Sequence, residues 1–244
     1  MEIAALLAQL DAEGGLLPLA AEHAGWDAPV PACADWTVRD VVVHTGGVHR
    51  WAADIVRTRG RSFDTAASDA VGSGPTDGEL LDWFRTGHAE LVETLRSAPD
   101  DLDCATFLPA DSPRHFWARR QAHETAIHRA DVMAAVNEPV EFPADFAQDG
   151  IAEMLLGFAR RRREPAAREV TLALAASDGP SWLVRAGGER VAAEQGTDGE
   201  ADARIAGSSS GLYLWVWNRP STAVVTGDPS AAELWASTVR VRWG

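Results

Sequence analysis

Apolar residues recur every three to four positions through the first 165 or so residues, which is the period of amphipathic helices. Thr37 and Asp40 have the spacing of a capping box, with Asp in place of the usual Glu, so a long helix is expected to begin there. Ser112 followed by Pro113 is typical of another helix start. The expected helices cover residues 3–19, 37–57, 76–97, 112–136 and 143–163.

Gly46 and Gly47 interrupt the second of these helices. A glycine pair inside a helical pattern indicates either a bend or a close contact with another helix.

The hydrophobic period shortens after Glu164 and Pro165, where apolar and polar residues begin to alternate. Short runs of this kind, separated by Gly and Asp, predict β-strands. The expected strands lie at 170–177, 181–188, 190–195 and 201–208, and two short helices are expected at 208–219 and 229–237. The pattern predicts an α+β protein with a helical domain over 1–165 and a small α/β domain over 166–244.

Composition excludes several classes of partner and site. The 244 residues contain 36 acidic and 22 basic side chains, all of the latter Arg, for a net charge of −14. Nucleic-acid binders and proteins of anionic membrane surfaces carry basic patches, so neither kind of partner is expected. Two distant cysteines, Cys33 and Cys104, exclude a disulfide scaffold and a Cys-rich zinc site.

The chain shows no signal-peptide pattern and no segment approaching the roughly 18 apolar residues of a membrane span, so a cytoplasmic location is expected.

The candidate chemistry is on the helix expected at 112–136. Glu124 and His128 are four residues apart and therefore share one face of it. His123 lies about 100° around the helix, so this is not the HExxH motif of zinc proteases. His44 lies on an apolar face of the second helix and needs a buried partner, which a divalent metal shared with Glu124 and His128 would supply.

Simpler interpretations of these residues stay open. A histidine on an apolar face is often a core residue with a hydrogen-bond partner, and a Glu–His pair at this spacing is often a helix ion pair. Asp40 and Asp131, each one turn from a candidate ligand, are either orienting partners or solvated charges.

The stretches at 36–52 (WTVRDVVVHTGGVHRWA) and 118–132 (ARRQAHETAIHRADV) resemble the mycothiol-dependent maleylpyruvate isomerase family, and so does the C-terminal part, including the segment WVWNRP. The resemblance implies a DinB-like four-helix bundle followed by a sterol-carrier-like α/β domain. Its metal-binding His, Glu and His match His44, Glu124 and His128. An active-site Arg of the family matches Arg219, whose alternative interpretation is a surface residue at a helix end.

The resemblance also implies a divalent metal, usually zinc, that holds mycothiol as its thiolate. In the isomerase this thiolate adds to the cis double bond of maleylpyruvate, and rotation and elimination give fumarylpyruvate. The same geometry would serve an S-transferase. A different class of function is a non-catalytic metal-binding bundle that acts as a binding or regulatory module. The expected partners are a small-molecule substrate and a low-molecular-weight thiol.

Overall fold

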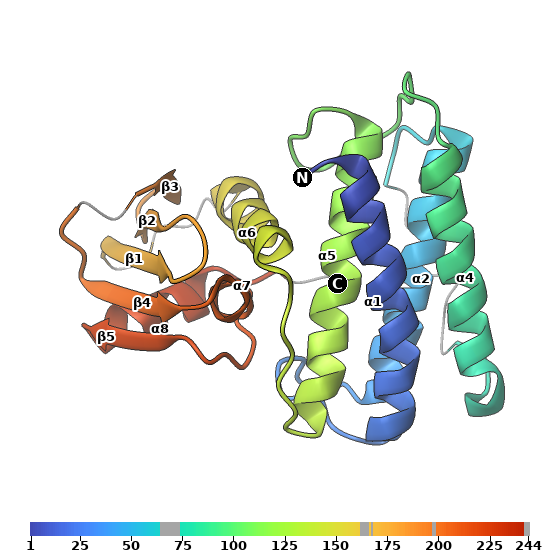
Figure 1. Ribbon diagram of the computed structural model, residues 1–244, viewed down its shortest axis with the longest axis horizontal. Helices are drawn as coiled ribbons and strands as arrows, with labels where there is room; N and C mark the ends of the chain where they lie inside the picture. The colour runs from blue at the N-terminus through green and yellow to red at the C-terminus, as the bar shows by residue number, and fades with distance from the viewer. Residues whose placement is uncertain (64–73, 162–165, 167, 197–198, 242–244) are drawn as a thin grey trace. The chain divides into compact units, whose positions relative to one another are not determined.

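The computed structural model describes residues 1–63, 74–161, 166, 168–196 and 199–241 (Figure 1). The chain divides into two compact units, Met1–Val140 and Glu141–Gly244, which are described separately.

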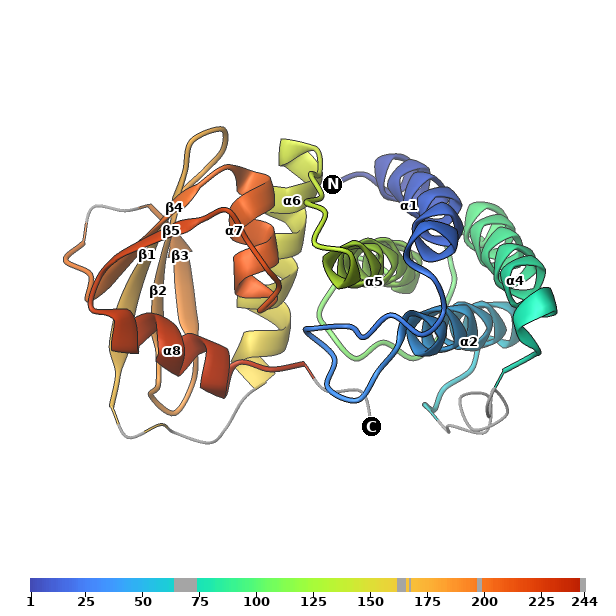
Figure 2. The same cartoon turned by 90° about the horizontal axis from the view of Figure 1, so that it is seen from below.

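The described residues of the first unit form a bundle in which four helices pack together (Figure 2). Helix α5 packs against α1 and α2, while α4 packs against the same two helices on the other side. The helices are α1 (Ile3–Ala24), α2 (Val38–Thr58), α4 (Asp77–Ser97) and α5 (Pro113–Ala135). This confirms the predicted helical bundle.

The caps that begin α2 and α5 are those predicted from the sequence. The Thr37 hydroxyl accepts from the Asp40 backbone N–H, and the Asp40 carboxylate accepts from the Thr37 backbone N–H at 2.8 Å. Ser112 caps α5 by accepting from the His115 N–H, with Pro113 in the first turn. Each cap satisfies backbone donors that a helix leaves without partners at its start.

The glycine interruption in α2 marks a close helix contact. A Cβ atom on Gly46 would lie 2.3 Å from the Trp83 ring of α4, so only glycine lets the two helices approach this closely.

Helix α1 is long and apolar enough, by length and composition, to cross a membrane. This corrects the expectation that no segment of the chain approaches the apolar length of a membrane span. In the bundle its apolar side is fully buried at Leu6, Leu10 and Leu17. The core helix of a soluble protein passes the same test, so the property does not by itself indicate a membrane protein.

The second unit combines helices with a mixed five-stranded sheet of order β3-β2-β1-β4-β5. Strands β1 and β4 are parallel, with Leu172 opposite Ala203, and the other neighbours are antiparallel. The strands are β1 (Val170–Ala176), β2 (Trp182–Ala186), β3 (Ala192–Gln195), β4 (Ala203–Gly207) and β5 (Val224–Gly227). The first four were predicted, whereas β5, whose residues are all exposed, has no apolar–polar alternation and was not.

The helices of this unit are α6 (Ala144–Ala152), α7 (Ser209–Val216) and α8 (Pro229–Thr238). Helix α6 continues as a π-helix over Glu153–Phe158 and a 3₁₀ turn over Ala159–Arg161. In Figure 2, α7 lies between the sheet and α6. The combination with the bundle confirms the α+β class.

The boundary between the units differs from the one expected near residue 165, which itself lies outside the described residues. The units divide after Val140, so α6 belongs to the second unit. The reason is its packing on α7: a Cβ atom on Gly150 would lie 2.2 Å from the Tyr213 ring, which is fully buried. A helical period shows that a face is buried but not which partner buries it.

Two adjacent glycines of α1 give a test of bundle packing. A Cβ atom on Gly14 would lie 2.1 Å from Cε1 of the buried His88, whereas nothing lies within 4 Å of one on Gly15. We expect Gly14→Ala to lower the free energy of unfolding by about 1–3 kcal/mol through overpacking. Gly15→Ala should raise it by up to about 1 kcal/mol because alanine favours helix. Urea denaturation measures both, and equal effects would contradict the tight α1–α4 contact.

Candidate metal centre

Three side chains from two helices meet at one point in the bundle. Nε2 of His44, on α2, lies 3.3 Å from Oε1 of Glu124, on α5, and Nε2 of His128 lies 3.2 Å from the same oxygen. The three atoms all lie within 4.8 Å of one another. The structure thus brings together the three residues that the sequence marked as candidate ligands.

The three residues differ in their access to solvent. Glu124 and His128 are buried, and the side chain of His44 is 20% exposed. The imidazoles of His44 and His128 contact edge to face, with ring centroids 5.0 Å apart. Trp36 packs on both, its ring centroid 4.9 Å from that of His44 and 6.1 Å from that of His128. The indole therefore forms one wall of the centre, a role that the sequence interpretation did not assign to Trp36.

Asp131 holds His128 in place. Its carboxylate Oδ2 lies 3.0 Å from Nδ1 of His128 and is completely buried. An N–H donated from Nδ1 to Asp131 leaves Nε2, the nitrogen that faces Glu124, to bind a metal when His128 is neutral. A carboxylate at Nδ1 is the usual outer partner of a metal-binding histidine. The thiol of Cys33 also donates to this oxygen, at 3.6 Å.

Of the two aspartates considered as orienting partners, only Asp131 contacts a candidate ligand in this way. The carboxylate of Asp40 accepts from the backbone and hydroxyl of Thr37, so it caps α2.

Arg120 pairs with the second oxygen of Glu124. Its Nη2 lies 3.1 Å from Oε2, and both side chains are buried. The sequence interpretation missed Arg120, although it precedes Glu124 by four residues, the same spacing that joins Glu124 to His128. That repeat along one helical stripe is the signal that identifies it.

These contacts set the protonation of the centre. Burial would raise the pKa of Glu124, but hydrogen bonds from His128 and His44, with the charge of Arg120, hold it well below its usual range. Burial would likewise lower the pKa of His128, but hydrogen bonds to Asp131 and Glu124 raise it to about 9. Without a metal, the carboxylate is therefore ionised and His128 is protonated.

The donor set fits a divalent transition metal. Two imidazole nitrogens and one carboxylate oxygen are the protein ligands of known catalytic zinc sites that keep a position open. In the part of the chain that the structure describes, no other three His, Cys, Asp or Glu side chains bring ligand atoms this close together.

Two other buried histidines of the bundle, His49 and His123, lie outside the cluster. Nε2 of His49 lies 2.9 Å from the hydroxyl of Thr125, which itself donates to the Gln121 carbonyl, so His49 carries its proton on Nε2. His123 is buried on another face of α5 and is not part of the cluster. The position of His123 agrees with the helical geometry, which placed it about 100° around the helix from Glu124.

Arg219 lies in the second unit, just after α7. Its backbone N–H donates to the Leu214 carbonyl, and Nη1 donates to the Trp217 carbonyl at 2.7 Å. It therefore follows the end of a helix and is half-buried, and its role toward a substrate stays a prediction.

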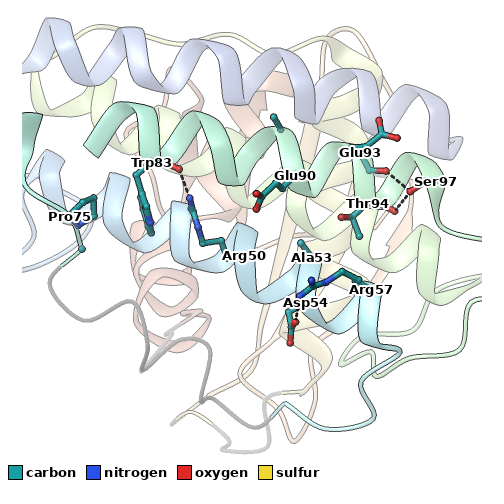
Figure 3. Close-up of a pocket in the computed structure, with 12 residues that line it drawn as sticks. Arg50, Ala53, Asp54, Arg57, Pro75, Trp83, Glu90, Glu93, Thr94 and Ser97 are labelled. Atoms are coloured by element: carbon teal, nitrogen blue, oxygen red, sulfur yellow. Dashed lines mark hydrogen bonds and ion pairs between the residues drawn. The ribbon is translucent and has the colours of Figure 1, made fainter. Parts of the chain in front are cut away.

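A groove of about 1060 Å³ runs between α2 and α4, away from the three candidate ligands (Figure 3). Arg50 lies over the Trp83 ring, 4.0 Å from its centroid, and donates to the Trp83 carbonyl. Arg57 pairs with Asp54 along the same wall. Both arginines among the described residues that line the groove are thus engaged by groups of the protein.

Comparison with known proteins identifies relatives of both units. Residues 5–133 match the mycothiol maleylpyruvate isomerase N-terminal domain, and residues 145–234 match the MDMPI C-terminal domain. Two crystal structures share the fold with a TM-score of 0.65 and cover 93% of both chains: a mycothiol-dependent maleylpyruvate isomerase, 13% identical, and a mutant form, 12% identical. No curated protein matches the chain.

A second pair of buried imidazoles gives a prediction about pH. The rings of His49 and His88 lie 5.2 Å apart, and Nε2 of His88 is 3.8 Å from Asp11 Oδ1, beyond hydrogen-bond distance. Burial lowers the pKa of both, and that of His49 is further lowered by His88. The unfolded chain therefore takes up protons below about pH 6.5 that the folded chain does not.

We expect these two histidines to lower stability as the pH drops below about 6.5, by up to about 1 kcal/mol each at pH 5.5, whereas His128, whose pKa is raised to about 9, contributes in the opposite direction over the same range. Urea denaturation at pH 7.5 and 5.5, with EDTA present, measures the loss. His88→Gln, which cannot take up a proton, should reduce it, whereas His23→Gln on the surface of α1 should not. If His88→Gln loses as much stability between pH 7.5 and 5.5 as the wild type, the imidazole of His88 is not held neutral by burial.

Proposed function

Because the chain belongs to the mycothiol-dependent maleylpyruvate isomerase family by its matches over residues 5–133 and 145–234, we propose that it is a metal- and mycothiol-dependent enzyme. It would activate a low-molecular-weight thiol at a divalent metal, most simply zinc, for cis–trans isomerisation or thiol transfer. The observation that supports this most is the convergence of His44, Glu124 and His128 on one point.

The residues around the three ligands support the proposal because each orients one of them. Asp131 fixes the ring of His128 by accepting at Nδ1. Arg120 engages Oε2 of Glu124 and leaves Oε1 for the centre. Trp36 covers the two imidazoles. Ligands held by such outer partners lose less freedom when they bind a metal.

A bound divalent metal supplies a Lewis acid that stabilises the thiolate form of a thiol ligand at neutral pH. The chain itself offers no thiol suited to this task. Burial raises the pKa of Cys104, and the thiol of Cys33 donates to the Asp131 carboxylate, which does not favour its ionisation. The nucleophilic sulfur is therefore expected to come from mycothiol.

In the proposed isomerisation, the thiolate sulfur forms a bond to one carbon of a conjugated cis double bond, and the electron pair moves to the conjugated carbonyl. The remaining single bond rotates. The carbon–sulfur bond then breaks as the double bond re-forms in the trans geometry, so the thiol is returned unchanged. A guanidinium binds carboxylates bidentately, and Arg219 is the residue we propose for the substrate carboxylate.

Metal content tests the ligand assignment. We expect about one zinc per chain after incubation with zinc and dialysis, and almost none in Glu124→Gln or His44→Ala. Elemental analysis measures this, and circular dichroism verifies that the variants are folded. Glu138→Gln, at a surface carboxylate that pairs with His23, is the matched control and should keep its metal. Metal-free wild type would overturn the proposal, and metal retained in Glu124→Gln would overturn the ligand assignment.

Turnover tests the enzyme. The zinc-loaded protein should convert maleylpyruvate to its trans isomer only when mycothiol is present, or should transfer mycothiol to an electrophilic bimane. Arg219→Met should raise KM for the dicarboxylate without changing metal content. Product formation is followed by chromatography. Thiol binding without either reaction would contradict the enzyme and favour a binding or regulatory module instead.

A further inference from the structure

The two histidines of the candidate centre are held in different ways, and we propose that Trp36 is the positioning residue of His44, fixing the plane of its imidazole by ring contact instead of by a hydrogen bond. The centroid of the indole lies 4.9 Å from that of the His44 ring, and the two planes are tilted by 55°. The inference rests on the proposed metal site and deepens it, because it assigns the orientation of one ligand to a residue outside the ligand set.

A histidine binds a metal only when its ring is turned correctly. The lone pair of Nε2 lies in the plane of the imidazole, so rotation about χ2 swings it away from the metal. That torsion has a broad energy profile and does not fix the ring by itself. Metal-binding histidines are therefore held through their other nitrogen, and His128 follows this rule because Asp131 lies 3.0 Å from its Nδ1.

His44 lacks this kind of support. Its Nε2 lies 3.3 Å from Oε1 of Glu124, but within the described part of the chain no protein group bonds to its Nδ1. The side chain is 20% exposed, and a hydrogen bond to solvent exchanges too fast to hold a ring. Two rings contact the imidazole instead, the indole of Trp36 and, at 5.0 Å between centroids, the imidazole of His128. Because His128 is itself a ligand, Trp36 is the neighbour that can act as an outer partner.

Trp36 can orient His44 because it is itself fixed. Its backbone N–H donates to the Cys33 carbonyl at 3.0 Å, and its carbonyl accepts from the Val30 N–H at 2.9 Å. The next residue, Thr37, caps α2, the helix that carries His44. The indole is half-buried and packs against an apolar cluster to which α1, α2 and α4 contribute. A side chain that positions a ligand needs such support from its own neighbours.

Zinc affinity tests the role of the indole. Trp36→Leu keeps an apolar side chain but removes the rings that contact His44. We expect it to weaken zinc binding by about tenfold or more, as the loss of an outer partner of a metal ligand does. Trp36→Phe, which keeps a flat ring at the same place, should retain most of the affinity. Dissociation constants are measured by competition with a chromophoric chelator, and unchanged zinc binding in Trp36→Leu would overturn the proposal.

The matched control is Trp26→Leu. Trp26 is also half-buried and packs against the same apolar cluster, and among the described residues it makes no ring contact with His44 or His128. This substitution should lower stability toward urea, as Trp36→Leu does, because both remove packed apolar atoms, but it should leave the zinc dissociation constant unchanged. If both variants weaken zinc binding equally, loss of packing explains the effect and Trp36 does not position His44.

A measurement on the metal-free protein tests the ring directly. Carbon-13 relaxation at Cε1 of each histidine reports ring motion on the picosecond to nanosecond timescale. In Trp36→Leu we expect the order parameter of His44 to fall by about 0.2 or more, while that of His128 stays as in the wild type because Asp131 holds its ring. An unchanged order parameter at His44 would contradict the proposal. Equal loosening of both rings would do so as well, because Cys33 of the same loop donates to Asp131 and the whole loop would then have moved.

The ring measurement needs no metal, so it separates the positioning role from the proposed function. If the wild type binds no zinc, the proposed function is contradicted whatever the rings do. If it binds zinc but Trp36→Leu changes neither the affinity nor the motion of His44, only the positioning role is wrong. Circular dichroism verifies that the variants are folded, and Trp36→Met, which also lacks a ring, replaces Trp36→Leu if the latter does not fold.

Discussion

The candidate centre depends on one carboxylate, that of Glu124, which stays ionised although it is buried. Glu124 is 3% exposed, and an unpaired carboxylate there would be protonated or would destabilise the fold. Its two oxygens are divided between different partners, with Arg120 at Oε2 and the imidazoles of His44 and His128 at Oε1. The arrangement compensates the charge and at the same time leaves one oxygen directed at two nitrogen donors.

Most of this arrangement lies along a single helical stripe. Arg120, Glu124 and His128 follow one another at intervals of four residues on α5, and Asp131 completes the stripe three residues later. A rigid helix therefore holds four of the five polar groups in register, and their relative positions do not depend on long-range packing. Only His44 must be brought in from another helix.

The position of His44 depends on how α2 is started and how closely it packs. The Thr37–Asp40 cap begins the helix, and the absence of a side chain at Gly46 lets it approach Trp83 on α4. Helix α2 also contacts α5 through the His49–Thr125 hydrogen bond, one and a half turns beyond His44. Two polar contacts from α2 to α5, at Glu124 and at Thr125, thus set the register between these helices. At 12–13% identity, the similar crystal structures show how much sequence change this bundle and its companion unit can accommodate.

The sequence by itself determined the features that depend on residues close together in the chain. The caps at Thr37 and Ser112, the helices they begin, four of the five strands and the shared face of Glu124 and His128 follow from local periods and spacings. The addition of His44 to these two was only one interpretation among several, because a period shows that a histidine is buried but not what it meets.

Tertiary structure decided what depends on contacts between distant residues. It brought His44 to Glu124 across 80 positions of sequence, placed Trp36 over the imidazoles and assigned α6 to the second unit through Gly150 and Tyr213. Strand β5 exists because its backbone pairs with β4, and its exposed side chains carry no pattern that would show this. Helical and strand periods record the burial of a face, whereas the identity of the partner that buries it is set only when the chain packs.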